Sequence, residues 1–324
     1  MMQTVELHSW LSRQISRFIK LRRLSGTDYS SQARLLLYFD RFLVKQYPNE
    51  SSITRHITDH YRQTISHLRM RVQFNRLCVV RQLCKYIAQT VPDYYVPEST
   101  ICVTAQEVFH PYIFSEQEIK ALLSATLALP PPKSLRPHTY QTLFGLLYTT
   151  GIRIGEAFSL ALGDFQAERN LLYIAEGKFR KARWLPLHPS ISQMLNQYVE
   201  SRRYFGSRAL GSPLFMNLRK RRLCHSTVYQ TFRQLLEKCG IPHHKHTGPR
   251  IHDLRHTFAV HRLLAWYRDK QDVNIMLPAL ATYMGHVSVG STHIYLRPTV
   301  ELLEQVNNRF HNHYLHNFKT RGES

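Results

Sequence analysis

The chain has 324 residues, of which 43 are lysine or arginine and 22 are acidic, so its net charge is +21 with histidines neutral. A field of this sign attracts polyanions, and nucleic acid is the commonest large one; a basic surface that serves only solubility is the alternative. The chain has no apolar stretch of ~18 residues, which predicts no membrane span, and its N-terminus has no apolar signal core. Its five cysteines form no C-x-x-C pair and are expected to be reduced. The sequence therefore predicts a cytoplasmic protein without disulfides.

The basic charge is spread over the whole chain. Residues 1–107 hold 15 basic and 8 acidic residues, a net charge of +7, and the remaining residues hold 28 and 14, a net charge of +14. Because both parts have the same sign, we expect both to contact the phosphate backbone of a nucleic acid.

The first part of the chain is predicted to be helical. Apolar residues recur at helical spacing in SSQARLLLYFDRFLVKQY (30–47) and in RMRVQFNRLCVVRQLCKYIAQ (69–89), with arginines on the outer faces. Three prolines and no periodicity from Val91 onward indicate a linker. We therefore expect a helical DNA-binding domain over residues 1–95 and a linker over residues 96–112.

A second domain is expected to begin at residue 113. Ser115 and Glu118 have the spacing of a capping box that opens a helix, and LPPPKSLRP then forces a loop. HTYQTLFGLLYTTGIRIGEAFSLAL predicts two helical pieces that Gly151 separates. LLYIAEG and ARWLPLH are two β-rich runs joined by KFRK, and they predict a β-hairpin.

Further helices are predicted at residues 190–205, 226–238 and 251–268. The chain closes on TVELLEQVNNRFHNHYLHNF, which carries one apolar stripe at helical spacing and packs either on its own domain or on a second copy of the chain. The expected fold class is therefore mainly α with a small β-hairpin or sheet, and the second domain covers residues 113–324.

The stretch IHDLRHTFAVHRL raises the question of whether it binds a cation or an anion. His252 and His256 are four residues apart, the spacing of a zinc-binding pair on a helix, and HHKH at 243–246 offers further ligands. Arg255, however, lies on much the same face and would repel a metal ion. The alternative to a zinc site is an anion site, for example for a phosphate, in which His256 would pack or support the site.

Other candidate groups are unremarkable when each is taken alone. Arg153 follows Gly151 at the start of a helix, where its guanidinium can bind a phosphate or pair with Glu156. Lys178 lies at the tip of the expected hairpin, with Arg180, Lys181 and Arg183 after it, in a charge run that is also typical of a solvated turn. Tyr283 has a helical spacing that favours packing.

Taken in order, these motifs resemble those of the tyrosine recombinases, the phage integrase family. TTGIRIGEA resembles the first arginine box, HDLRH matches the H-x-x-R box, YMGH resembles the L-G-H box with methionine in place of leucine, and STHIYLRP resembles the tyrosine box. The resemblance covers about residues 112–300. The segment LLAWYRDKQDVNIMLPALATYMGH departs from the family because it is longer than the usual connection.

The resemblance implies a role for each site residue. Arg153 and Arg255 would neutralise charge on the scissile phosphate, Tyr295 would be the nucleophile, and Lys178 would protonate the departing 5′-oxygen. His252 would bind the phosphate or take the tyrosine proton, His286 would donate a hydrogen bond, and Glu156 would orient these groups. No cofactor and no metal ion are implied.

The expected function is therefore site-specific recombination of double-stranded DNA through a 3′-phosphotyrosyl intermediate, for integration or excision of a mobile element. The resemblance also implies a core-binding domain at the N-terminus, a homo-tetramer on synapsed DNA with accessory proteins, and an assembly helix at the C-terminus. A topoisomerase of type IB, which shares the chemistry, and a non-catalytic DNA-binding regulator are the alternatives.

Overall fold

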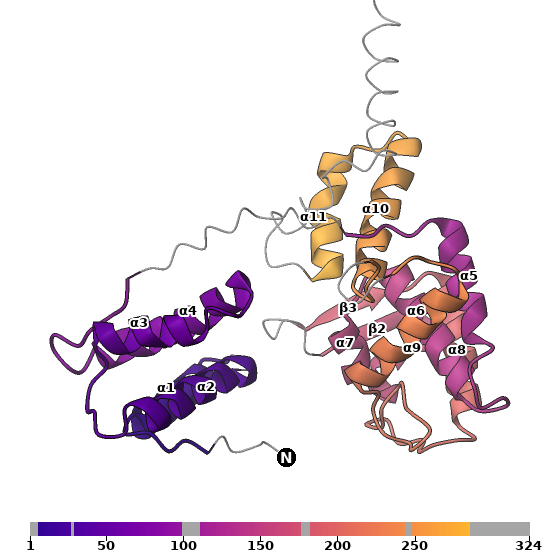
Figure 1. Ribbon diagram of the computed structural model, residues 1–324. Coiled ribbons are helices and arrows are strands. Elements are labelled where there is room, and N and C mark those ends of the chain that lie inside the picture. The colour runs from indigo at the N-terminus through magenta and orange to yellow at the C-terminus, as the bar shows by residue number, and fades with distance from the viewer. Residues whose placement is uncertain (1–5, 27–28, 99–110, 176–181, 244–247, 286–324) are drawn as a thin grey trace, which may run out of the picture. The chain divides into compact units, whose positions relative to one another are not determined.

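The computed structural model describes residues 6–26, 29–98, 111–175, 182–243 and 248–285 (Figure 1). The chain divides into two compact units, Met1–Phe109 and His110–Ser324. Helices predominate in both units and the second contains a small sheet, so the predicted fold class is confirmed. Within the ranges given above, no helix has both the length and the apolar composition needed to cross a bilayer.

The described part of the first unit contains helices and connecting turns but no strand. Its helices are α1 (Ser12–Leu24), α2 (Ser30–Gln46), α3 (Arg55–Thr64) and α4 (Met70–Ile87). The sequence predicted α2 and α4, and the apolar faces of all these helices meet in one core that includes Phe18, Phe39 and Leu83. Arginines remain on the outside, as the periodicity indicated.

The second unit alternates helices with one short sheet. Its elements are α5 (Glu116–Thr126), α6 (Arg136–Thr150), α7 (Ile154–Ser159), β1 (Phe165–Gln166), β2 (Leu171–Ile174), β3 (Arg183–Pro186), α8 (Pro189–Arg202), α9 (His225–Lys238), α10 (Asp253–Arg268) and α11 (Val273–Met284). The capping box of Ser115 and Glu118 at the start of α5 is confirmed.

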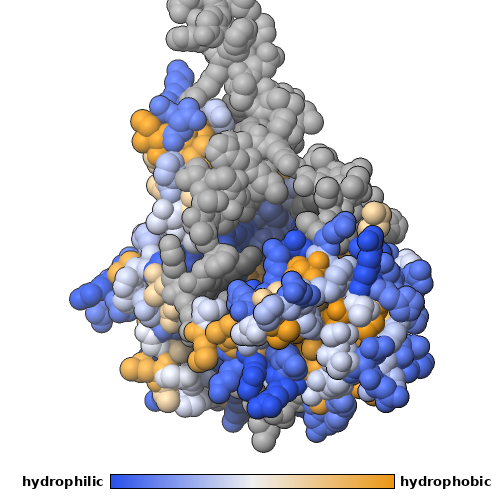
Figure 2. Space-filling view, turned by 90° about the vertical axis from the view of Figure 1, so that its left-hand side faces the viewer, coloured by the Kyte–Doolittle hydropathy of each residue, from blue (hydrophilic) through white to orange (hydrophobic). Residues whose placement is uncertain are grey.

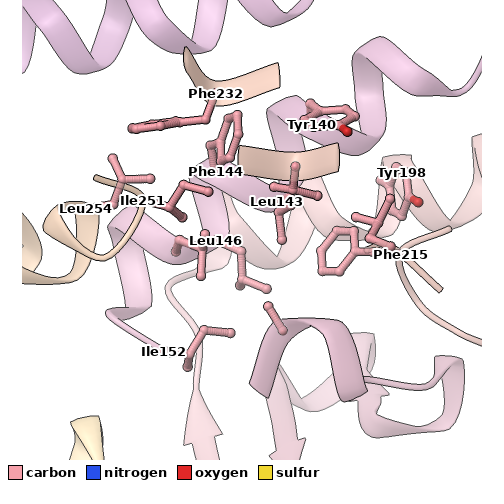
Figure 3. Packing of buried hydrophobic residues seen from close by; sticks show 14 of the residues in the cluster. Tyr140, Leu143, Phe144, Leu146, Ile152, Tyr198, Phe215, Phe232, Ile251 and Leu254 are labelled. Carbon is pink, nitrogen blue, oxygen red and sulfur yellow. The ribbon is translucent and has the colours of Figure 1, made fainter. Parts of the chain in front are cut away.

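Helix α6 is the central element of this unit. It is buried on most sides, because α5, α8 and α10 pack around it. In Figure 3, Leu143, Phe144 and Leu146 of α6 point toward aromatic and aliphatic side chains from later parts of the chain, such as Phe232 and Leu254. This core fixes the C-terminal end of α6, from which the chain enters the candidate site.

The sheet has the order β1-β2-β3 and is antiparallel throughout. The predicted pairing of β2 with β3 is confirmed, with Leu172 opposite Leu185 and both side chains buried. The sequence did not predict β1, because a strand of two residues has no periodicity to detect. The hairpin tip with Lys178 lies outside the described residues.

The long segment before His286 forms ordered helical structure rather than a simple connection. Helix α10 continues to Arg268, and α11 follows after a short turn, with Pro278 inside it. The two helices lie side by side in Figure 1 and share an apolar cluster that includes Phe258, Leu263 and Met284. This segment therefore builds the helix whose C-terminal end reaches the site.

Gly151 ends α6 in a left-handed conformation with φ of 62°, and the chain turns there into α7. A Cβ atom on Gly151 would overlap the ring of Phe258 from α10. The glycine is thus required both by the backbone conformation and by the close packing of α10 on the turn.

We expect Gly151→Ala to lower the free energy of unfolding by ~2–4 kcal/mol. Alanine is strained in the left-handed conformation, and its Cβ atom would also crowd the ring of Phe258. Urea unfolding of the full chain, followed by circular dichroism, measures the change. Gly155→Ala is the matched control. Gly155 lies inside α7, and no atom within 4 Å would meet its Cβ, so this change should stabilise the helix by up to ~1 kcal/mol. Equal effects of the two substitutions would contradict the packing argument.

Candidate active site

Arg153 and Glu156 form the first part of the candidate site, at the start of α7. Arg153 is the N-cap residue of α7, and its backbone N–H donates to Glu156 Oε2 over 3.0 Å. Its guanidinium Nη1 donates to Glu156 Oε1, also over 3.0 Å. The pairing of Arg153 with Glu156, one of the two arrangements foreseen for it, is confirmed, and one carboxylate holds both the backbone and the side chain of Arg153.

Arg183 of β3 approaches the same carboxylate from the sheet. Its Nη2 lies 2.9 Å from Glu156 Oε2, and its Nη1 lies 3.2 Å from Oε1. Glu156 is only 3% exposed. Burial alone would raise the pKa of the carboxyl, but the hydrogen bonds from Arg183 and from the Arg153 backbone outweigh it, so the pKa falls below its usual value. Glu156 is therefore ionised at neutral pH.

Arginine side chains also converge on the C-terminal end of α11. Arg153 donates to the Gly285 carbonyl over 2.9 Å, and Arg255, from α10, donates to the adjacent Met284 carbonyl over 2.9 Å and to the Gly151 carbonyl. Carbonyls at a helix C-terminus lack intrahelical partners and carry partial negative charge, so cations are stabilised there. The two predicted arginines, far apart in the sequence, thus meet neighbouring carbonyl groups.

His252 lies at the entrance to α10, one turn before Arg255. The residue as a whole is exposed, but its ring is partly buried. This burial is the larger cause, and the positive charge of Arg255 the second, that lowers the pKa of His252 to about 4. The neighbouring Asp253 is held by Arg250 through contacts of 2.8 and 3.3 Å. At neutral pH the imidazole of His252 is therefore uncharged and able to accept a proton.

His256 is buried, and its ring meets that of His252 edge to face with centroids 5.0 Å apart. It packs behind His252, as the sequence indicated. Among the residues that the structure describes, no three His, Cys, Asp or Glu side chains gather in a group able to hold a metal ion. Of the HHKH histidines, only His243 lies within the described part of the chain.

The remaining predicted site residues, Lys178, His286 and Tyr295, lie outside the described residues. The neighbouring Tyr283 is described, and its ring stacks on Phe258 while its hydroxyl donates to the Pro186 carbonyl over 3.1 Å. Burial raises the pKa of Tyr283 to about 12. Tyr283 therefore has a packing role, as its helical spacing indicated.

Sequence reasoning missed Arg183 as a member of this site. It was counted in the charge run of a solvated turn, whereas only 13% of its side chain is exposed. The alternation of side chains along a strand indicates where Arg183 points. Arg183 and Leu185 are two residues apart in β3, so their side chains share the inward face. A basic residue on the buried face of a strand requires an acidic partner.

Comparison with known proteins identifies the family of the chain. Residues 113–301 match the model of the phage integrase family. The chain belongs to that family. It is a tyrosine-type site-specific recombinase, as the order of its motifs predicted.

Relatives match over most of the chain. A Sinorhizobium fredii protein named "Putative integrase/recombinase y4rB" is 34% identical over 310 residues, covering 93% of this chain and 97% of the relative. A tyrosine recombinase XerC of Roseiflexus castenholzii is 31% identical over 188 residues, 57% of this chain and 54% of the relative.

Solved structures share the fold. The integrase of transposon Tn1549 in complex with transposon right end DNA has a TM-score of 0.67 at 13% identity, over 94% of this chain and 99% of that one. The XerH site-specific recombinase bound to difH substrate has a TM-score of 0.62 at 20% identity, over 88% and 81%. These likenesses concern the fold alone.

The neutral state of His252 is directly measurable. We expect its imidazole to titrate with a pKa of about 4 in NMR spectra of the DNA-free protein, with His252→Gln identifying the resonance. An unfolded chain would take up this proton near its ordinary pKa of ~6.5, so this residue makes the fold less stable as the pH falls from ~6.5 to ~4. A measured pKa at or above 6.5 would contradict the assignment.

Proposed function

We propose that this recombinase cuts and rejoins DNA strands through a covalent 3′-phosphotyrosyl intermediate, with Tyr295 as the nucleophile. The observation that carries the proposal is the meeting of Arg153 and Arg255 at neighbouring carbonyls of α11. Tyr295 lies only ten residues beyond Gly285 in the sequence, so the chain that leaves this point contains the nucleophile.

The two arginines supply what the reaction requires. Attack on a phosphodiester builds negative charge on the non-bridging oxygens, and a well-placed donor stabilises such charge by ~3–4 kcal/mol. An arginine carries five N–H donors, so bonding to carbonyls does not by itself exclude phosphate binding by these two residues. Their rigid bonding partners hold them in place before the substrate arrives.

The proton transfers complete the cycle. The Tyr295 oxygen attacks phosphorus as the neutral His252 accepts its proton, the bond from phosphorus to the 5′-oxygen breaks, and Lys178 protonates the leaving oxygen. His286 donates a hydrogen bond to the phosphate. The energy of the broken bond stays in the phosphotyrosyl ester, so a 5′-hydroxyl of another strand reverses the step without ATP.

The proposed substrate is a specific site in double-stranded DNA, recombined for a mobile element. Three observations support this: the net charge of +21, a relative named as an integrase/recombinase, and a transposon integrase of the same fold. On this proposal residues 1–95 bind the core site, residues 113–324 cut it, and the C-terminal stretch docks on a neighbouring copy in a homo-tetramer on synapsed DNA. Accessory recombination proteins are further partners.

An exposed basic turn at residues 217–222 extends the proposed DNA-binding surface. The Asn217 side-chain oxygen accepts from the backbone N–H groups of Arg219 and Arg221, over 2.9 and 3.1 Å, which fixes the turn. Arg219, Lys220 and Arg221 are all exposed. Arg222 anchors the turn through carbonyls at the end of α7.

Figure 2 shows one face of the molecule, on which hydrophilic residues predominate and hydrophobic residues form separate areas.

Tyr295→Phe tests the mechanism. We expect this variant to bind duplex DNA as well as the wild type does but to give no denaturant-resistant protein–DNA adduct on a nicked substrate. The wild type should form the adduct in the presence of excess chelator. Adducts that persist in the variant, or cleavage that chelator abolishes and zinc restores, would contradict the proposed chemistry.

The basic turn is tested by its effect on salt dependence. Replacing Arg219, Lys220 and Arg221 with glutamine should weaken duplex binding and lower the slope of log affinity against log salt by ~2–3, since each phosphate contact contributes ~0.9. Fluorescence anisotropy over a salt series measures the slope. The control replaces the exposed Arg203, Arg268 and Lys270, which removes the same charge. Equal losses in the two triple variants would mean that the turn makes no specific contact.

A further inference from the structure

The side chain of Arg183 contacts two other segments of the second unit at once. Besides its two bonds to Glu156 at the start of α7, its Nε donates to the Tyr283 carbonyl over 3.1 Å, and its Nη2 lies 3.4 Å from the Met284 carbonyl. One guanidinium therefore joins β3, α7 and the C-terminal end of α11.

The contacts form a chain of bonds that ends at Arg153. Arg183 holds both oxygens of Glu156, and each of those oxygens also accepts from Arg153, one from its backbone and one from its guanidinium. Rotation of the Glu156 carboxylate would break all four bonds together. Arg183 therefore restricts the carboxylate to the one orientation that also holds Arg153.

We propose that Arg183 is a positioning residue for the cleavage step: through Glu156 it fixes the guanidinium of Arg153 against the C-terminal end of α11. This inference rests on the proposed function, because Arg153 matters for the reaction only if it binds the scissile phosphate. Arg183 itself does not contact the reacting atoms.

The backbone of Gly285 supports the proposal independently. Gly285 ends α11 in a left-handed conformation with φ of 70°, and a Cβ atom there would lie 2.7 Å from Arg183 Nη1. The guanidinium of Arg183 thus lies directly against the backbone of the residue whose carbonyl accepts from Arg153. A side chain at position 285 would displace Arg183, so the glycine and the arginine are required together.

Lysine cannot replace arginine here. The planar guanidinium presents two parallel N–H groups to the carboxylate and a third to the Tyr283 carbonyl, whereas an ammonium group is a single point at the end of a flexible chain. Arg183→Lys preserves the charge but loses the fixed fork, and so it separates geometry from electrostatics.

The first measurement is the single-turnover rate of adduct formation on a nicked duplex. We expect Arg183→Gln to slow cleavage by ~10²-fold, the effect of misplacing a catalytic group by about 1 Å, and Arg183→Lys to slow it nearly as much. Affinity for the duplex should stay within a factor of two or so, since Arg183 is not proposed to touch DNA. The matched control is Arg203→Gln, which removes the surface ion pair with Glu200 and should leave the rate unchanged.

A second substrate distinguishes positioning from a general loss of structure. A methylphosphonate at the scissile position carries no charge on its non-bridging oxygen, so it needs less neutralisation by Arg153. On this substrate, the rate of Arg183→Gln relative to wild type should rise toward one, as should that of Arg153→Gln. A misfolded variant would be equally slow on both substrates.

The double variant Arg183→Gln, Glu156→Gln gives a further check. Glu156 also holds Arg153 directly, so if Arg183 acts only through Glu156, Arg183→Gln should add little to the defect of Glu156→Gln alone. Wild-type rates in Arg183→Gln, or an equal defect on the two substrates, would overturn the inference. Adduct formation by Tyr295→Phe would instead overturn the proposed function, so the two proposals fail by different results.

Discussion

The negative end of α11 holds the arginines of this site in one place. The carbonyls of Tyr283, Met284 and Gly285 accept hydrogen bonds from Arg183, Arg255 and Arg153. Guanidinium groups brought together repel one another, and this repulsion must be offset before any substrate is present. The partial charge of the helix end offsets part of it, and the ionised carboxylate of Glu156, shared by two of the arginines, offsets more.

Much of the fold could be predicted because its signals are local. The capping box at Ser115, the break at Gly151 and the alternation of the hairpin strands each depend on a few neighbouring residues. Helix α11 was missed because it is short and apolar on several sides, with Pro278 inside it, so it has no clear helical periodicity. Its position at the centre of the site could not be read from the sequence, because long-range packing determines it.

The candidate site shows the same division between local and long-range information. The order of the motifs was sufficient to select Arg153, Glu156, His252 and Arg255, and their partners follow from the structure. Arg183 was overlooked because neighbouring lysine and arginine residues made it look like part of a solvated run. Its role depends on an acidic partner 27 positions earlier in the chain and on carbonyls about 100 positions later, and no local pattern encodes that meeting.

The short helix α7 is fixed at both ends by arginines. Arg153 begins it beneath the end of α11, and Arg222 donates to the carbonyls of Phe158, Ser159 and Leu160 where it ends. Each residue added to a helix turns one end by about 100° relative to the other. An inserted or deleted residue between positions 154 and 159 would therefore turn Arg153 away from the end of α11 while Arg222 stayed bound. The length of α7 thus sets the angle between these two arginines, and substitutions within it that keep Glu156 leave that angle unchanged.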